Sequence, residues 1–105
     1  MSENVLELNK GNFRKIIEDK ETPVLVDIWA PWCGPCRAIA PELEAVASQL
    51  GGRVRVAKVN VDQEPELAEE FGVQSIPNLI LFKGGRAVRQ MIGFVDRKRL
   101  AEALA

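Results

Sequence analysis

The stretch "PVLVDIWAPWCGPC", residues 23–36, joins the most apolar segment of the chain to its only two cysteines. Residues 23–30 are apolar at nearly every position and rich in Val and Ile, which is typical of a central strand covered by helices on both faces. Cys33 and Cys36 follow at once, separated by a Gly-Pro dipeptide. The stretch therefore predicts the middle of a sheet, with a cysteine pair directly beyond its central strand.

The segments on either side alternate between strand and helix patterns, without an internal repeat or a low-complexity linker. The expected elements are an edge strand at 5–8, a helix within 9–20, strands at 23–30 and 53–62, helices at 35–50 and 63–72, strands at 78–82 and 86–93, and a last helix at 96–105. The helix at 35–50 is expected to bury one apolar stripe, Ile39, Leu43, Val46, Ala47 and Leu50, and to end at the pair Gly51-Gly52. Asp96 is expected to cap the last helix, with Leu100 and Leu104 on its buried side. A tight hairpin joins the last two strands, which makes them antiparallel and the sheet mixed. The pattern predicts an α/β fold, a central mixed sheet of about five strands with about four helices on both faces.

Length and composition limit the number of domains and the kinds of partner. The chain has 105 residues, 47% of them apolar, so residues 1–105 are expected to form a single domain. Its 14 basic and 15 acidic residues nearly cancel, which is not the basic footprint of a nucleic-acid or membrane binder. Neither a signal-peptide layout nor an apolar run of membrane-spanning length is present. We therefore expect a cytoplasmic protein that binds neither nucleic acid nor membrane. We also expect it to be a monomer.

The cysteine pair has three interpretations: a stabilising disulfide, a metal site or a redox reagent. A disulfide that closes so short a loop contributes only about 2 kcal/mol in the chain-entropy model, so stabilisation is a poor reason for this spacing. Zinc usually takes four ligands, and a chain without histidine is short of them unless carboxylates or a second copy complete the site. A C-x-x-C beside a β-α-β pattern is instead the usual signature of dithiol–disulfide exchange. Redox chemistry is favoured, and no metal is expected.

The expected order of attack follows from the position of each cysteine in a helix that begins at Cys33. Residues three apart lie on one face of a helix, which permits a disulfide after small shifts. The unpaired N–H groups and positive dipole end favour a thiolate, so Cys33 is predicted to be the exposed nucleophile. Cys36, one turn inside, is predicted to be a buried thiol that resolves the mixed disulfide. Pro35 is tolerated in the first turn and stiffens the active loop.

Asp27 stands inside the most apolar strand, where burial should raise the pKa of its carboxyl group. It is therefore a candidate proton acceptor, the alternative being an Asp that faces solvent at a sheet edge. Of the two tryptophans, Trp29 continues the core strand and is predicted to pack inside. Trp32 adjoins Cys33 and is predicted to form part of a substrate-facing surface.

The motifs "VDIWAPWCGPC" and "SIP" (75–77), with the order of elements, resemble the thioredoxin family over the whole chain. The resemblance implies the thioredoxin fold and a protein-disulfide reductase in which Cys33 and Cys36 are the redox-active pair. It implies that the chain binds no cofactor and that a flavin-dependent thioredoxin reductase restores the dithiol with electrons from NADPH. The implied partners are that reductase and proteins that contain disulfides, in electron transport and cell redox homeostasis.

The same resemblance assigns roles outside the cysteine motif. Asp27 would assist deprotonation of Cys36 with Lys58 as its partner, although Lys58 in an alternating strand could equally face water. Sequence alone favours a trans Ile76–Pro77 bond, because cis bonds are a small minority of X-Pro bonds. The resemblance implies instead a cis bond packed against the cysteines, with the Ile76 backbone paired to an extended substrate peptide.

The implied substrate-binding residues are Trp32, Gly34, Pro35, Ile76, Pro77 and Gly93, and Ile92 and Phe94 would complete the patch. Gly93 could be a turn glycine or a point of close approach for a docking peptide. Pro31 before Trp32, Asn78 where threonine is common, and the absence of tyrosine depart from the family pattern. These departures bear on substrate preference and redox potential more than on the reaction.

Two other functions fit parts of the sequence. Oxidase or isomerase domains, such as those of protein disulfide isomerase, resemble this fold but commonly carry histidine between the cysteines. The Gly-Pro spacer removes that thiolate-stabilising imidazolium and favours a reducing couple. A non-catalytic binding module could instead use the patch around Trp32 to hold a partner, and it would keep that partner after both cysteines were replaced by serine.

Overall fold

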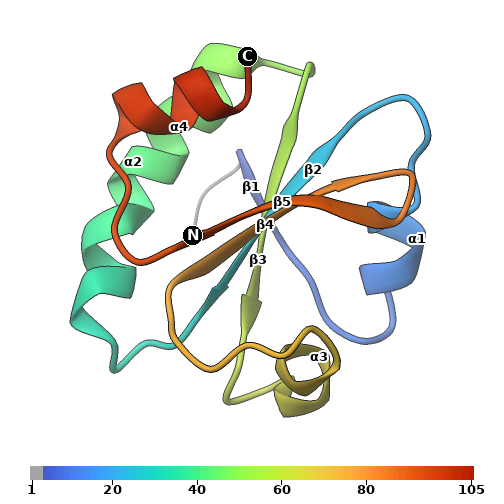
Figure 1. Cartoon of the computed structure of the whole chain (residues 1–105), viewed down its shortest axis with the longest axis vertical. Coiled ribbons are helices and arrows are strands. Elements are labelled where there is room, and N and C mark those ends of the chain that lie inside the picture. The colour runs from blue at the N-terminus through green and yellow to red at the C-terminus, as the bar shows by residue number, and fades with distance from the viewer. Residues whose placement is uncertain (1–3) are drawn as a thin grey trace.

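A computed structural model describes residues 4–105 of the chain. Its elements are β1 (Val5–Glu7), α1 (Phe13–Ile17), β2 (Val24–Trp29), α2 (Gly34–Leu50), β3 (Arg55–Asn60), α3 (Pro65–Glu70), β4 (Asn78–Lys83), β5 (Arg86–Ile92) and α4 (Arg97–Ala103) (Figure 1). The predicted order of strands and helices is confirmed, and the observed ends differ from the expected ones by a few residues. Such differences are ordinary, because element ends depend on local caps and turns.

The sheet is mixed and β2 lies at its centre, as the apolar pattern of residues 23–30 predicted. The strand order is β1-β3-β2-β4-β5. β3 pairs in parallel with both β1 and β2, whereas β4 is antiparallel to β2 and β5 is antiparallel to β4. The end of β2 that leads into the cysteines therefore lies at the same sheet edge as the ends of β3 and β5 and the start of β4.

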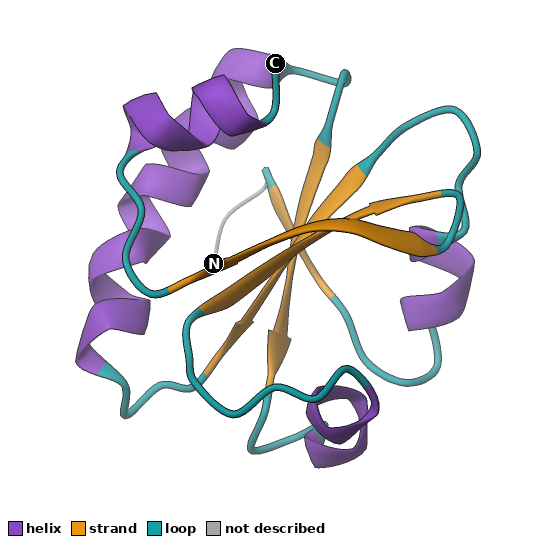
Figure 2. Ribbon diagram, in the orientation of Figure 1, coloured by secondary structure: helices purple, strands orange, loops and turns teal. Residues whose placement is uncertain are grey.

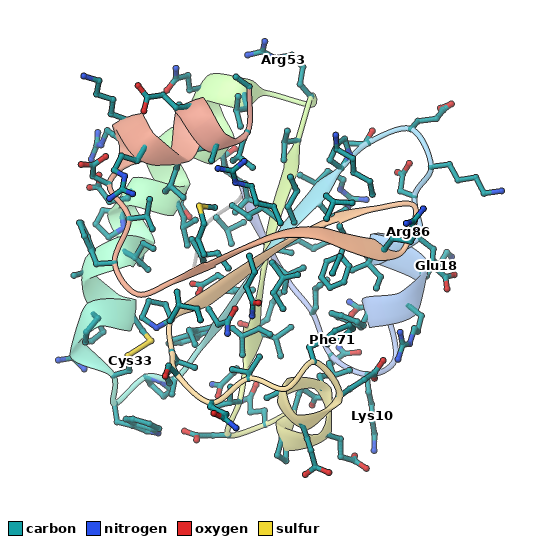
Figure 3. The ribbon with its side chains drawn as sticks, in the orientation of Figure 1. Lys10, Glu18, Cys33, Arg53, Phe71 and Arg86 are labelled. Atoms are coloured by element: carbon teal, nitrogen blue, oxygen red, sulfur yellow. A yellow bond between two sulfur atoms is a disulfide. The ribbon has the colours of Figure 1, made fainter. Side chains whose placement is uncertain are left out.

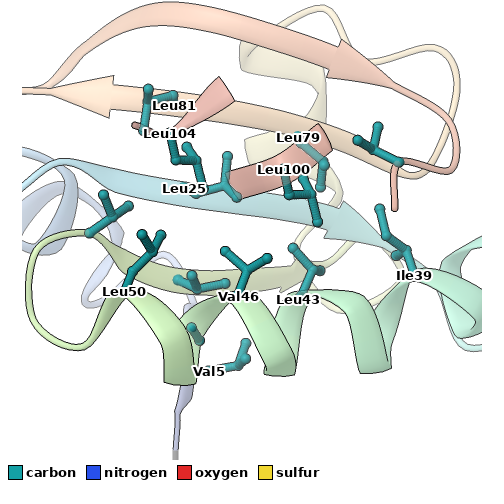
Figure 4. Close-up of a cluster of buried hydrophobic side chains, with 14 residues drawn as sticks. Val5, Leu25, Ile39, Leu43, Val46, Leu50, Leu79, Leu81, Leu100 and Leu104 are labelled. Atoms are coloured by element: carbon teal, nitrogen blue, oxygen red, sulfur yellow. The ribbon is translucent and has the colours of Figure 1, made fainter. Parts of the chain in front are cut away.

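Each face of the sheet carries its own apolar core, with α2 and α4 over one face and α1 and α3 over the other (Figures 1 and 2). Figure 4 shows the first core, where Leu25 of β2 and Val46 of α2 belong to one buried cluster. On the opposite face, Val26 of β2 is buried in a cluster with Phe82 of β4. Successive strand side chains point to opposite faces, so Asp27 projects on the same side as Leu25, toward α2.

Helix α2 begins at Gly34 because Cys33 serves as its N-cap: the Cys33 Sγ accepts the Cys36 N–H at 3.2 Å. Pro35 is compatible with the first turn, where no intrahelical N–H bond is lost. The predicted apolar stripe is buried along the helix at Ile39, Leu43, Val46, Ala47 and Leu50. Gly51 then ends the helix with a φ of 59°, which side-chain-bearing residues rarely adopt.

Helix α4 lies beside α2 on the same face of the sheet (Figure 1). The Asp96 side chain caps it as predicted by accepting the Arg99 N–H at 2.9 Å. Leu100 and Leu104 are buried against the sheet, also as predicted. Within residues 4–105, no helix combines the length and the apolar character that a membrane span requires.

Candidate redox site

Cys33 and Cys36 form a disulfide at the N-terminus of α2, directly after β2 (Figure 3). Their Cα atoms lie 5.2 Å apart, which is the spacing expected for residues three apart on one helix face. The Cys33 sulfur stands before the first helical residue, where it faces the free N–H groups and the positive end of the helix dipole. A thiolate at this position would be stabilised in a way that the Cys36 sulfur, one turn further, would not.

The two sulfur-bearing residues are more alike in exposure than we expected from the sequence. Cys33 is 6% exposed and Cys36 is 2% exposed, so in the disulfide form both are buried. Apolar neighbours including Trp29 and Ile76 pack against the pair, and the Ile76 carbonyl oxygen lies 3.8 Å from the Cys33 Sγ. Position relative to the helix end, rather than exposure, is therefore what distinguishes the two cysteines in this state.

The bond between Ile76 and Pro77 is cis, as the family resemblance implied and contrary to the trans bond that the residues alone favoured. Pro77 is buried, directly before β4. Its carbonyl oxygen accepts the Gly93 N–H at 2.8 Å, which ties the end of β5 to this loop. Gly93 has a φ of 89°, and a Cβ added there would meet no atom within 4 Å, so it is the turn conformation that requires the glycine.

Exposed side chains surround the disulfide at this edge of the sheet. Trp32 is 67% exposed, as predicted, and its indole Nε1 donates to the Asp62 carboxylate at 3.1 Å. Gly34 and Pro35 are also exposed. On the other side of the disulfide, Ile92 and Phe94 are large exposed apolar residues, whereas Ile76 and Gly93 are only partly exposed.

Asp27 is buried, with 4% exposure. It lines a cavity of about 250 Å³ together with Trp29, Cys36 and Lys58, and its Oδ1 has no hydrogen-bond partner. Burial raises the pKa of this carboxyl group from its ordinary value of 3.8 to about 7, and the nearby Lys58 charge opposes part of the rise. A carboxyl group with a pKa near neutrality can both accept and release a proton at physiological pH.

Lys58 is opposite Asp27 in the register of the parallel β2–β3 pair. Its side chain is half-buried, and its Nζ lies over the Trp29 ring at 4.8 Å from the ring centroid. Among the described residues 4–105, no ion pair within 4.0 Å joins Lys58 to Asp27. The lysine is therefore near enough to bias the carboxylate electrostatically while its cation rests on an aromatic face.

Sequence reasoning missed two side chains that hold the active loop. Asp62 binds the Trp32 indole from the loop after β3, and the Arg37 Nη1 donates to the Pro31 carbonyl at 3.0 Å. The first contact depends on the ends of β2 and β3 being adjacent, which no local pattern reveals. The second is a short-range contact, but an exposed arginine in a helix carries no signal that it bonds backward to a loop.

The arrangement of the two cysteines fits dithiol–disulfide exchange. A cysteine at a helix N-terminus can attack as a thiolate, and a second cysteine one turn away can release the product, because thiol–disulfide exchange proceeds through a mixed disulfide. The fold and the site together therefore define the class of thiol–disulfide oxidoreductases.

Comparison with known proteins gives the family. The thioredoxin family model matches residues 4–105. The chain is 52% identical over 98 residues to thioredoxin of Alicyclobacillus acidocaldarius and 43% identical over 98 residues to thioredoxin 1 of a Nostoc species, each covering 93% of this chain and 92% of the relative. It is 38% identical to the chloroplastic M-type thioredoxin of Chlamydomonas reinhardtii over 97 residues, 92% of this chain and 69% of that protein.

The chain belongs to the thioredoxin family. It is a thiol–disulfide oxidoreductase with protein-disulfide reductase activity, and the Cys33–Cys36 pair is its redox centre. Within residues 4–105, no three Cys, Asp or Glu side chains gather closely enough to hold a metal ion.

Proposed function

We propose that Cys33 is the attacking nucleophile and Cys36 the resolving thiol. The Cys33 thiolate attacks one sulfur of a substrate disulfide, which forms a mixed disulfide and releases the other substrate sulfur as a thiolate that takes up a proton. The Cys36 thiolate then attacks the Cys33 Sγ, which closes the intramolecular disulfide and releases the second substrate thiol. The observation that carries this assignment is the N-cap position of Cys33, whose sulfur accepts the Cys36 N–H.

Asp27 is the proton acceptor for Cys36 in this proposal. Both residues line the same cavity, and no protein donor occupies the Asp27 Oδ1. A carboxylate there can take the Cys36 proton when the mixed disulfide has formed, which creates the second thiolate where it is needed. Lys58 supports this role by favouring the charged form of Asp27.

The proposed substrate-binding surface lies around the disulfide. It consists of the exposed Trp32, Gly34 and Pro35, the partly exposed Ile76 and Gly93, and the buried Pro77 that follows Ile76, with the exposed Ile92 and Phe94 beside them. Within the described residues, the backbone N–H of Ile76 makes no hydrogen bond to another backbone group. An extended peptide could pair with this free backbone next to the Cys33 sulfur, as a strand adds to a sheet edge.

The reduced protein would be regenerated by a flavin-dependent thioredoxin reductase that draws electrons from NADPH, so that the chain acts as an electron carrier. We place it in the cytoplasm as a monomer whose residues 1–105 form a single domain. The family itself is not restricted to one compartment, since one relative is named chloroplastic.

The test is reduction of the interchain disulfides of insulin with dithiothreitol as the final reductant. Cys36→Ser should accumulate a mixed disulfide with the substrate, detectable by mass spectrometry, whereas Cys33→Ser should form none. If the Cys33→Ser variant formed the mixed disulfide through Cys36, the two roles would have to be exchanged. Equilibration of the wild-type pair in glutathione buffers would show whether the couple is reducing.

A further inference from the structure

The charged residues of the chain are unevenly distributed, although the whole chain is nearly neutral. Between residues 83 and 99 the only acidic residue is Asp96, and the basic ones are Lys83, Arg86, Arg89, Arg97, Lys98 and Arg99. Between residues 62 and 70 no basic residue occurs, and the acidic ones are Asp62, Glu64, Glu66, Glu69 and Glu70. One segment contains β5 and the start of α4, and the other contains α3.

The parts of these segments that follow β3 and β5 lie on opposite flanks of the redox site. Asp62 follows β3, which is on one side of β2, whereas Ile92 ends β5, which is on the other side beyond β4. Ile92 is opposite Asn78 in the β4–β5 register, one residue after Pro77. Figure 1 shows the chain passing from the end of β5 into α4 beside the start of α2. The basic segment is therefore continuous with the proposed substrate surface.

A groove of about 470 Å³ lies between β5 and α4 on this flank. Arg89 and Arg99 line it, together with apolar side chains that include Met91 and the exposed Phe94, and Glu102 is its one carboxylate. Within residues 4–105, neither Arg89 nor Arg99 has an ion-pair partner. Two guanidinium groups against one carboxylate leave the groove with a net positive charge.

The neighbouring arginine shows the contrast. Arg97 is paired with Glu42 of α2 at 3.1 Å, so its charge is already compensated within the molecule. Arg89 and Arg99 are exposed and form no ion pair within residues 4–105, and they line a groove that also includes Ile92 and Phe94 of the proposed substrate surface. A ligand that satisfied both would have to be anionic and to reach the groove from the redox site.

We propose that this groove, the β5–α4 groove, binds an acidic segment that adjoins the attacked cysteine of a protein substrate. The inference rests on the proposed substrate surface and names the kind of substrate that fits it. The acidic residues should lie on one side of the cysteine only, because the opposite flank carries Asp62 and would repel them. Exposed charge pairs contribute little to affinity individually, so the effect falls on the rate of productive encounter.

The probes are disulfide-linked peptides that differ only beside the cysteine: serines on both sides, or aspartates on the N-terminal side or on the C-terminal side. The protein is reduced with dithiothreitol, and kcat/KM is measured for each peptide by free-thiol release. At low ionic strength, we expect one of the two acidic peptides to be reduced about fivefold faster than the serine peptide. In 1 M salt, where the screening length is about 3 Å, the ratio should fall to about one.

Two variants with the same change of net charge locate the effect. Arg89→Gln combined with Arg99→Gln should lower the acidic-to-serine ratio to about one. Lys83→Gln combined with Arg86→Gln should keep the wild-type ratio, because the β4–β5 turn lies far from the disulfide; Figure 3 shows Arg86 and Cys33 on opposite sides of the molecule.

Three results would overturn the inference and leave the redox function intact. Equal rates for all peptides would show that charge beside the cysteine does not affect recognition of the substrate. If the variant with Arg89→Gln and Arg99→Gln still preferred acidic peptides, the preference would come from the electrostatic field of the whole protein and not from the groove. A dimer of the wild type by analytical ultracentrifugation, lost in the groove variant and without peptide preference, would assign the groove to a second copy. Failure to reduce any peptide would instead reject the proposed function, and this inference with it.

Discussion

The two faces of β2 differ in chemistry, although their side chains alternate along one strand. Toward α1 and α3, its Val and Ile side chains join a wholly apolar cluster with three aromatic rings whose centroids lie 5.3 to 5.9 Å apart, those of Phe13, Phe71 and Phe82. Toward α2, Asp27 and Trp29 line a cavity, and each has a buried polar atom without a hydrogen-bond partner. Both faces bury apolar side chains that stabilise the fold, but the face toward α2 also keeps an unsatisfied carboxyl group beside the cysteines, at a cost in stability.

Loss of packing on the apolar face should give the largest loss of stability. Phe82 is 1% exposed and packs edge-on against two other rings, so Phe82→Ala should lower the free energy of unfolding by about 4 kcal/mol. Urea unfolding followed by circular dichroism measures this loss, and Phe82→Leu should lose much less. Insulin reduction per folded molecule should remain close to that of the wild type. A loss of activity per folded molecule as large as the loss of stability would mean that the two faces are not separable.

On the cavity face, removing the charge should have the opposite effect on stability. The pKa of Asp27 is about 7 in the folded protein against 3.8 ordinarily, so between these pH values the unfolded chain releases a proton that the folded chain keeps. The contribution of Asp27 to the free energy of unfolding therefore falls by about 1.4 kcal/mol per pH unit as the pH rises from 3.8 to about 7. Above that range it stays constant.

Asp27→Asn replaces the carboxyl group with an amide that does not titrate. The difference in the free energy of unfolding between wild type and variant, measured at each pH, therefore isolates the contribution of Asp27. The variant should match the wild type near pH 4 and exceed its free energy of unfolding by about 4 kcal/mol at pH 8. It should also slow insulin reduction by about tenfold or more, because Cys36 loses its proton acceptor. A stability difference that did not change between pH 4 and pH 8 would show that the carboxyl group is not held protonated by burial.

A substitution on the same face of the sheet as Asp27, but outside its cavity, tests whether the rate of insulin reduction follows the free energy of unfolding. Asp96→Ala removes the N-cap of α4 and should lower the free energy of unfolding by about 1 kcal/mol. Reduction of insulin should change by less than about twofold, since α4 supplies no group to the cysteines and Asp96 does not line the β5–α4 groove. Slower reduction in this variant would mean that stability alone limits the redox rate on this side.

The smallest effect is expected at the exposed edge. Asp62→Asn replaces the carboxylate that accepts from the Trp32 indole with a neutral amide oxygen that can still accept. We expect a change in tryptophan fluorescence and less than about a threefold change in the rate of insulin reduction. Gln63→Glu, at the next and equally exposed position, changes the charge of the same loop without replacing the acceptor and is the matched comparison. A loss above about tenfold in Asp62→Asn would place this carboxylate in the chemistry itself.

Much of the fold followed from local patterns. The apolar run before the cysteines predicted the central strand, and the stripe after them predicted α2, because burial on two faces or on one leaves a characteristic period in the sequence. Asp96 as a cap and Gly51 as a helix end followed from backbone chemistry within a few residues. Asp27 was identified as a buried carboxyl group for the same reason, since its neighbours on both sides are apolar.

The site was predicted less completely, because its contacts join residues that are distant in sequence. The residues alone favoured a trans bond before Pro77, and only the resemblance to a family implied the cis bond that is observed. Cys33 was expected to be exposed, yet Ile76 and other neighbours cover it in the disulfide form. The sequence did not decide whether Lys58 pairs with Asp27 or faces water. In the structure the lysine is half-buried, and its Nζ lies over the Trp29 ring.

The sequence by itself determined the order of the elements, the central place of β2 and the position of the cysteine pair at a helix start. These depend on hydrophobic period, capping and proline or glycine chemistry, which act over a few residues. Only the tertiary structure decided what surrounds the disulfide: the Ile76 carbonyl beside Cys33, the Trp32–Asp62 contact and the separation of acidic and basic flanks. Those depend on strand order, which brings distant segments to one sheet edge and which no local pattern encodes.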